Sequence, residues 1–229
     1  RENEQFKAQN VRITDEHLGE GSAKTKFGYN IAAIQTLKQI EAEGRQARPD
    51  EQEILSRYVG WGGIPQAFDE ENTQWSEDYR PLKELLTEKE YDAARSSTLN
   101  AHYTSPTIIR AMYDAIEKMG FRTGNVLEPS CGVGNFFGML PDDMSGSRLY
   151  GVELDSITGR IARQLYPDAR ITISGFEKTQ RRDFFDLAIG NVPFGGYKVS
   201  DKQFDKYNFL IHDYFFAKTR EQVRPGGVI

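Results

Sequence analysis

The chain has little cysteine and histidine and lacks long apolar runs, and each shortage excludes a class of protein. Its single cysteine, Cys131, cannot form a disulfide within the chain, which favours a reducing, cytoplasmic setting. The three histidines and this cysteine are widely scattered, so we expect no metal site. No apolar run approaches the roughly 20 residues needed to cross a bilayer. The polar, charged start does not have the pattern of a signal peptide either. We therefore expect no membrane partner.

Charge is distributed unevenly along the 229 residues. The net charge is −5; residues 1–99 carry 13 Lys and Arg against 19 Asp and Glu, and residues 100–229 carry 16 against 15. A domain that binds nucleic acid tightly by itself usually has a basic excess, because phosphate neutralisation dominates affinity. Any DNA contact is therefore expected to be local, or to come from parts absent from this chain. The chain starts without methionine and ends in an unfinished strand pattern, so we expect a fragment of a longer protein.

The first hundred residues predict a helical region. Residues 1–25 begin with a polar stretch, and we expect them to be disordered. Apolar residues at helical spacing predict a helix over 26–43, a second over 49–58 and a third over 82–96. In the third, Thr87 followed by Glu90 fits a capping box. Residues 26–99 therefore read as a helical appendage.

The pattern changes after residue 100, where short strands alternate with helices. Strands are expected at 125–128, 149–153, 170–174 and 186–190, because each run is short, apolar and bounded by turn residues. Helices are expected at 136–140, 156–166 and 209–223, with a short polar one after residue 177. This alternation predicts an α/β fold with a Rossmann-like parallel sheet over 100–229, cut off after the fourth to fifth strand.

The loop after the first strand contains two closely spaced glycines. Gly132 and Gly134 let the backbone approach a ligand where a Cβ would collide. Phe137 stands where dinucleotide-binding loops have a third glycine, which argues against NAD or FAD. The acid before the loop, Glu128, is awkward beside a pyrophosphate but suits a cationic amino group, such as that of S-adenosylmethionine. The predicted cofactor-binding residues of this loop are Glu128, Pro129, Ser130, Gly132, Gly134, Asn135 and Phe136.

Glu153 ends the second strand, 25 positions after Glu128. An acid at about this distance commonly accepts hydrogen bonds from ribose hydroxyls, so we assign Glu153 to the cofactor ribose. The alternative is a solvated acid or a helix N-cap, and Asp155 fits the second description.

The fourth strand ends in Asn191, Val192, Pro193 and Phe194. The Asn191 side-chain oxygen and the Val192 carbonyl can accept the two hydrogens of an exocyclic amino group and favour a nucleophilic nitrogen. Phe194 can stack on the ring, a contact worth roughly 1–3 kcal/mol in base-binding proteins. A base in a duplex must first be flipped out. The alternative is an ordinary turn followed by a core aromatic residue.

These motifs, in this order, resemble the amino-group, N6-adenine type of DNA methyltransferases. The family's catalytic motif is Asn or Asp, Pro, Pro, then Tyr or Phe, so Val192 departs from it. In the family an acid after the third strand often binds the cofactor adenine, and Gly175 stands at that position here. The resemblance implies that Phe176 stacks on the adenine and that Glu177 bonds to it. Tyr103 and Thr104 resemble the family's tenth motif, which lines the methionine end of the cofactor.

The resemblance is closest to the methylase region at the front of large methylase–helicase proteins of conjugative and other mobile elements. Residues 58–63, 99–104, 190–195 and 211–216 carry it. It implies a DNA substrate and a downstream helicase portion of the same polypeptide. DNA contacts are expected from absent C-terminal regions and from the loop at 192–207. The cations near this loop either contact phosphates or form a solvated rim, and they are Arg181, Arg182, Lys198, Lys202 and Lys206.

The predicted reaction is methyl transfer from S-adenosylmethionine to the adenine amino group of DNA, with catalysis by positioning and by acceptors at the nitrogen. One rival keeps the chemistry but changes the substrate to RNA or to protein glutamine. Another is a degenerate domain that binds cofactor or DNA as a scaffold. Other conspicuous residues have structural interpretations: Trp61 as a packed helix end, Cys131 as a small buried hydrophobe, and Phe215 and Phe216 as helix core.

Overall fold

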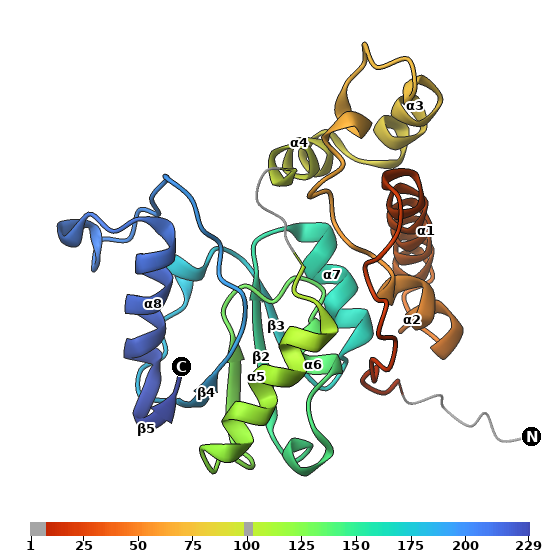
Figure 1. The fold of residues 1–229 in the computed structure, drawn as a ribbon. Helices are drawn as coiled ribbons and strands as arrows, with labels where there is room; N and C mark the ends of the chain where they lie inside the picture. The colour runs from red at the N-terminus through yellow and green to blue at the C-terminus, as the bar shows by residue number, and fades with distance from the viewer. Residues whose placement is uncertain (1–7, 99–102) are drawn as a thin grey trace, which may run out of the picture.

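A five-stranded, fully parallel sheet forms the centre of the C-terminal half (Figure 1). The computed structural model describes residues 8–98 and 103–229. The strand order is β3-β2-β1-β4-β5. From β1 the chain adds β2 and β3 on one side of the sheet, and it then crosses to the other side of β1 to add β4 and β5. The strands are β1 Asn125–Glu128, β2 Arg148–Glu153, β3 Arg170–Ile173, β4 Phe185–Ala188 and β5 Val223–Val228. The predicted α/β fold with a Rossmann-like parallel sheet is confirmed.

Side chains of the sheet alternate between two hydrophobic cores, because successive strand residues point to opposite faces. Val126 belongs to one core and Leu127 to the other. The first core holds α5, α6 and α7, and the second holds α8. These helices are α5 Pro106–Lys118, α6 Asn135–Gly138, α7 Ser156–Leu165 and α8 Ile211–Gln222. The predicted helix over 209–223 ends one residue early, since β5 begins at Val223 directly after α8.

The helical region comprises α1 Ala23–Ala42, α2 Pro49–Ser56, α3 Ser76–Leu85 and α4 Glu88–Ser97. The single helix expected over 82–96 is thus two helices. Leu86 is extended between them, and Thr87 begins the second as the predicted capping box with Glu90. Trp61 is buried edge-on against Phe68. The boundary expected at residue 100 falls within residues 99–102, outside the described residues, as does His102.

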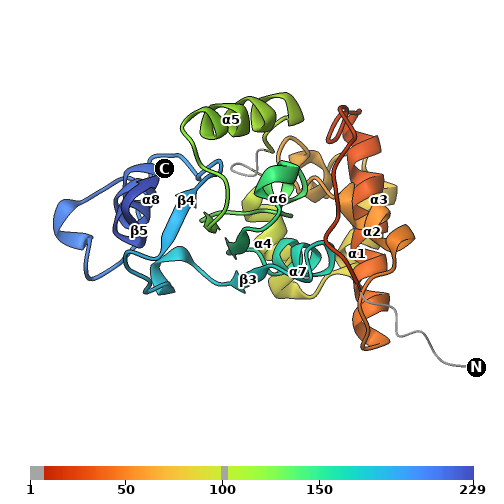
Figure 2. The ribbon, with the colours of Figure 1, turned by 90° about the horizontal axis from the view of Figure 1, so that it is seen from below.

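The helical region packs on α7, at the end of the sheet away from α8 (Figure 2). Arg160 of α7 pairs with Glu41 of α1 at 3.5 Å and with Glu90 of α4 at 2.6 Å. The side-chain amide of Gln52 in α2 donates to the Gln164 carbonyl at 2.9 Å. One ion-pair and hydrogen-bond network therefore fixes three of its helices to the sheet part.

The segment before α1 differs from the expected disorder over 1–25. The Val11 N–H donates to the Leu165 carbonyl at 2.9 Å, and the Ile13 N–H donates to the Gly138 carbonyl at 2.8 Å. Residues 8–22 therefore run along the sheet part as a hydrogen-bonded strap, while residues 1–7 lie outside the described residues. Among the described helices, none is long and apolar enough to cross a membrane.

Candidate active site

A cavity of about 590 Å³ lies at the carboxyl ends of the strands. Its walls include the loop after β1, the end of β2, the turn after β3 and the loop after β4. In this sheet β1 and β4 are neighbours, and the chain leaves them in opposite directions along the sheet. Such a switch point is where open α/β sheets bind ligands, because the two loops separate there and leave a crevice.

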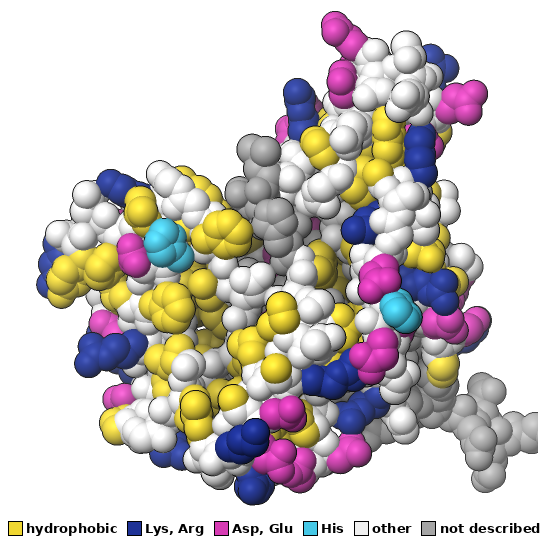
Figure 3. Space-filling model, viewed as in Figure 1, with side chains coloured by type: hydrophobic (Ala, Val, Ile, Leu, Met, Phe, Trp, Pro, Cys, Tyr) yellow, Lys and Arg dark blue, Asp and Glu magenta, His cyan; other side chains and the backbone are white. Residues whose placement is uncertain are grey.

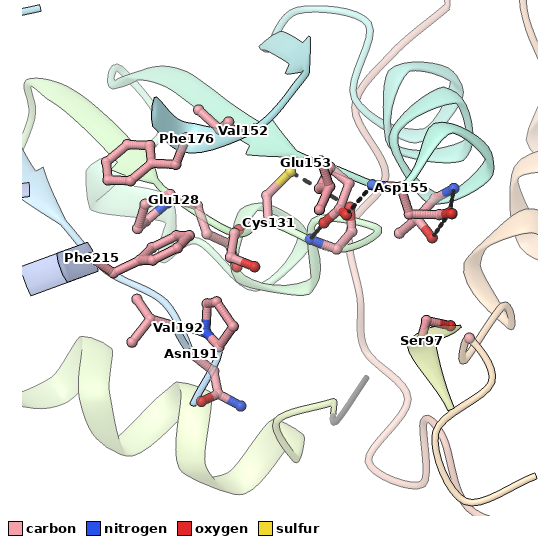
Figure 4. Close-up of a pocket in the computed structure, with 18 of the residues that line it drawn as sticks. Ser97, Glu128, Cys131, Val152, Glu153, Asp155, Phe176, Asn191, Val192 and Phe215 are labelled. Carbon is pink, nitrogen blue, oxygen red and sulfur yellow. Dashed lines mark hydrogen bonds between the residues drawn. The ribbon is translucent and has the colours of Figure 1, made fainter. Parts of the chain in front are cut away.

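The predicted site residues converge on this cavity. All of them line it except Gly134. Gly134 has a φ of +87°, and a Cβ there would lie 2.6 Å from the Tyr166 ring. This glycine is therefore required for the turn and for packing. Figure 4 shows the loop after β1 facing Asn191 and Val192 across the cavity.

Glu153 fastens the glycine loop to the end of β2. One carboxylate oxygen accepts the Gly132 N–H at 2.8 Å, and the other accepts the Asp155 N–H at 2.8 Å. Burial raises the pKa of Glu153 to about 7, although these two backbone hydrogen bonds favour its ionised form. The Asp155 side chain caps α7 by accepting the Thr158 N–H at 2.7 Å, as its N-cap interpretation predicted.

Glu128 is buried with a relative exposure of 2%. Its Oε2 atom has no hydrogen-bond partner among the described residues. Burial raises its pKa well above the usual value, and the charge of Glu153 adds to the shift. The described lining holds four acids, Glu128, Glu153, Asp155 and Glu177, and no Lys, Arg or His. A cationic ligand in the cavity would therefore favour the ionised forms of these acids.

The turn after β3 has no acid at position 175, but the chain supplies one from two residues further on. A Cβ at Gly175 would overlap the Glu177 carboxylate, so this carboxylate lies over the glycine. Phe176 lies between these two residues in sequence. Its side chain is buried and stacks on Phe215, with ring centroids 4.9 Å apart. A side chain at position 175 would therefore have to displace the Glu177 carboxylate.

The loop after β4 presents its aromatic residue to solvent at the cavity. Phe194 is 58% exposed, and Asn191 is also exposed, while both line the cavity. The alternative interpretation of Phe194 as a core aromatic is therefore wrong. The loop after β4 therefore places an amide and a largely exposed ring at the cavity.

Several lining residues were not found from the sequence as site residues. Tyr58, Ser96 and Ser97 come from the helical region, and Tyr197 and Phe215 come from the loop after β4 and from α8. Phe215 and Phe216 were both expected to be helix core. Phe215 is buried and also lines the cavity, whereas Phe216 is 59% exposed, so the prediction is wrong for Phe216. The segments around Tyr58 and Phe215 carry the family resemblance, which was the available signal for them.

No protein-family model matches the chain. It is 28% identical over 204 residues to the defense against restriction protein B of Escherichia phage P1. This match covers 86% of this chain and 8% of the phage protein. It is 35% identical over 79 residues to the type II methyltransferase M.CvrRI of Paramecium bursaria Chlorella virus XZ-6E, covering 34% of this chain and 21% of that protein. The chain is methyltransferase-like. These matches confirm the predicted resemblance, over a small part of each relative's length.

Two solved structures are similar over most of the chain. A class I S-adenosylmethionine-dependent methyltransferase from Listeria monocytogenes aligns with 14% identity and a TM-score of 0.44, covering 90% of this chain and 72% of the other. A TehB-like S-adenosylmethionine-dependent methyltransferase from Corynebacterium glutamicum aligns with 21% identity and a TM-score of 0.36, covering 68% and 71%. The fold assignment rests on the strand order of the sheet itself.

Proposed function

We propose that this chain binds S-adenosylmethionine and transfers its methyl group to the exocyclic amino group of adenine in DNA. The observation that carries the proposal is that two kinds of lining face one cavity. Four acids line it, and the loop after β4 borders it with an amide, backbone carbonyls and an exposed ring. The amino-methyltransferase reaction needs a cofactor site and an amino-group site within reach of each other.

The acidic lining fits the cofactor. Glu128, buried and incompletely hydrogen-bonded, would face the ammonium of the methionine moiety, with Tyr103 and Thr104 nearby. Glu153 already orients two N–H groups and would accept ribose hydroxyls. Phe176 and Glu177 would hold the adenine ring. The remaining loop positions assigned to the cofactor are Pro129, Ser130, Gly132, Asn135 and Phe136.

In the reaction the chain positions the nucleophile and leaves the electrophile to the cofactor. Bound S-adenosylmethionine supplies an activated methyl group. The Asn191 oxygen and the Val192 carbonyl accept the two amino hydrogens, and Pro193 restricts the backbone between this carbonyl and Phe194. Phe194 stacks on the ring. Asn191 is exposed, so the proton released from the nitrogen has a path to water. This is catalysis by orientation and by preformed dipoles.

The surface beside the catalytic loop supports an unpaired strand as the substrate. Hydrophobic side chains gather over the loop after β4 and over α8 in the view of Figure 3. Four aromatic residues here are strongly exposed: Phe194, Tyr197, Tyr207 and Phe216. Lysines 198, 202 and 206 lie among them in sequence, and Lys206 lies 4.8 Å from the Tyr207 ring centroid. Exposed rings with interspersed lysines are typical of surfaces that stack unpaired bases.

The match to the phage protein supports a larger context. We propose that the chain is the methylase portion of a mobile-element protein, with DNA recognition and a helicase supplied by other parts of the same polypeptide, acting in the cytoplasm. The chain matches only 8% of that relative. A modest net charge of −5 fits a part that depends on others for tight DNA binding.

The test is methyl incorporation from labelled S-adenosylmethionine into DNA, RNA and protein. Asn191→Ala should lower incorporation into DNA by about 10²–10³-fold, the usual effect of removing one oriented polar group. Its affinity for S-adenosylmethionine should stay within about twofold. Asn72→Ala, in a turn of the helical region, is the matched control. Label in RNA or protein would favour the substrate rival, and cofactor binding without any transfer would favour the scaffold rival.

A further inference from the structure

A buried lysine of α8 connects two walls of the cavity. The Lys218 side chain has a relative exposure of 7%. Its Nζ donates to the Asp201 carboxylate at 2.8 Å and to the Glu177 carbonyl at 3.0 Å. Glu177 follows β3, and Asp201 belongs to the loop after β4. One ammonium group therefore joins segments that have no direct backbone ladder between them.

Asp201 organises the loop after β4. The oxygen that binds Lys218 also accepts the Tyr214 hydroxyl at 2.8 Å, and the other oxygen accepts the Gln203 N–H at 3.1 Å. Burial alone would raise its pKa, but the hydrogen bonds from Lys218 and Tyr214 hold the pKa of Asp201 below its usual value. The Asp201 carboxylate is therefore ionised at neutral pH. Tyr197 and Val199, just before Asp201, line the cavity.

The other partner of Lys218 belongs to the wall assigned to the cofactor adenine. Glu177 and Phe176 both line the cavity. The Lys218 Nζ lies 5.8 Å from the Phe176 ring centroid, behind the cavity wall. The Phe176 ring in turn stacks on Phe215, three residues before Lys218 on the same helix. A shift of the turn after β3 is thus transmitted to α8 through a ring stack and a hydrogen bond.

We propose that Lys218 is a positioning residue that couples cofactor binding to substrate binding. The inference rests on the proposed function. Cofactor bound against Phe176 and Glu177 would hold the Glu177 carbonyl in place. This carbonyl holds the Lys218 ammonium, and the ammonium in turn holds Asp201. The loop that carries Tyr197 and Val199 is thereby held as well. Cofactor should then strengthen binding of the substrate strand, and substrate should strengthen cofactor binding by the same factor.

A purely structural role predicts a different pattern of effects. Removing only one member of a buried pair leaves an uncompensated charge and is strongly destabilising, whereas neutralising both members is far milder. Lys218→Met should therefore lower the melting temperature more than the double variant Asp201→Asn/Lys218→Met does. In the double variant the amide that replaces the Asp201 carboxylate keeps an oxygen for Tyr214, while the link to Glu177 is lost. The double variant therefore separates coupling from folding.

The experiment measures binding of the 229-residue chain to two probes, each with and without the other at saturation. Binding of S-adenosylmethionine is measured by calorimetric titration. The second probe is a fluorescein-labelled single-stranded DNA with a single adenine among thymines, and its binding is measured by fluorescence anisotropy. Its length of about 12 nucleotides is enough to span one stacking surface. In the wild type each ligand should tighten the other by about fivefold or more, the lower end of allosteric couplings. In the double variant this factor should fall to about one, while the melting temperature falls less than in Lys218→Met. The control pair is Glu53→Gln/Arg57→Met, an exposed ion pair between α2 and its C-cap residue.

Each outcome bears on one proposal. Equal coupling in the wild type and the double variant, or no coupling in the wild type although both probes bind, overturns the role of Lys218. Failure of the wild type to bind S-adenosylmethionine overturns the proposed function and the inference with it. Loss of coupling in the control pair as well would assign the effect to general destabilisation and reject the proposal.

Discussion

Cofactor affinity should depend on pH through Glu153. Burial raises its pKa to about 7, and only its carboxylate form can accept two ribose hydroxyls while holding the Gly132 N–H. If binding requires the ionised form, the populated fraction falls about tenfold between pH 8 and pH 6, which corresponds to about 1.4 kcal/mol. The apparent dissociation constant of S-adenosylmethionine should rise by that factor.

Calorimetric titration at both pH values, in buffers of different ionisation enthalpy, measures the constant and the protons released. Near pH 7 about half a proton per cofactor should be released from Glu153. The α-amino group of the ligand titrates nearby, so Glu153→Gln provides the baseline; it should bind weakly with only the ligand's own pH dependence. An equal pH dependence in the wild type and in Glu153→Gln would refute the assignment of the proton to this carboxylate.

The same carboxylate, and three other positions, give further predictions. Without cofactor, the free energy of unfolding should fall as pH rises from 4.5 to about 7, because a raised pKa means that the folded state holds its proton longer; urea denaturation of the wild type and Glu153→Gln checks this sign. Gly134→Ala should destabilise the chain by about 1–3 kcal/mol, since it strains a positive φ and meets Tyr166; an unchanged urea midpoint would contradict the packing role. Gly175→Ala should displace the Glu177 carboxylate and weaken S-adenosylmethionine binding at an unchanged melting temperature, as measured by calorimetry. Arg160→Met should lower the melting temperature by leaving Glu90 without one of its cations, and hydrogen exchange should localise the loosening to α4 and α7.

The sheet was predictable because its signals are local. Each of the first four strands is a short apolar run bounded by turn residues, and the observed bounds lie within two residues of the expected ones. The glycine loop and the 191–194 motif were found for the same reason. Their convergence followed from a general property of parallel sheets, whose carboxyl ends share one edge.

The features that were missed depend on partners far away in the chain. The strap over residues 8–22 is held by carbonyls of Leu165 and Gly138, which no local pattern indicates. The acid over Gly175 comes from Glu177 only because the turn folds back on itself. Tyr58 and Ser97 reach the cavity through the packing of α2 and α4 on the sheet part.

Tyr58, Ser96 and Ser97 form part of the cavity wall, and this limits how far the chain can be shortened from its N-terminus without opening the cavity. A shortened chain beginning at residue 103 would keep all five strands and the loops after β1 and β4. It would nevertheless uncover the apolar side of α7 and open this side of the cavity to bulk water. The helices before the sheet are therefore part of the cavity wall rather than a detachable tail.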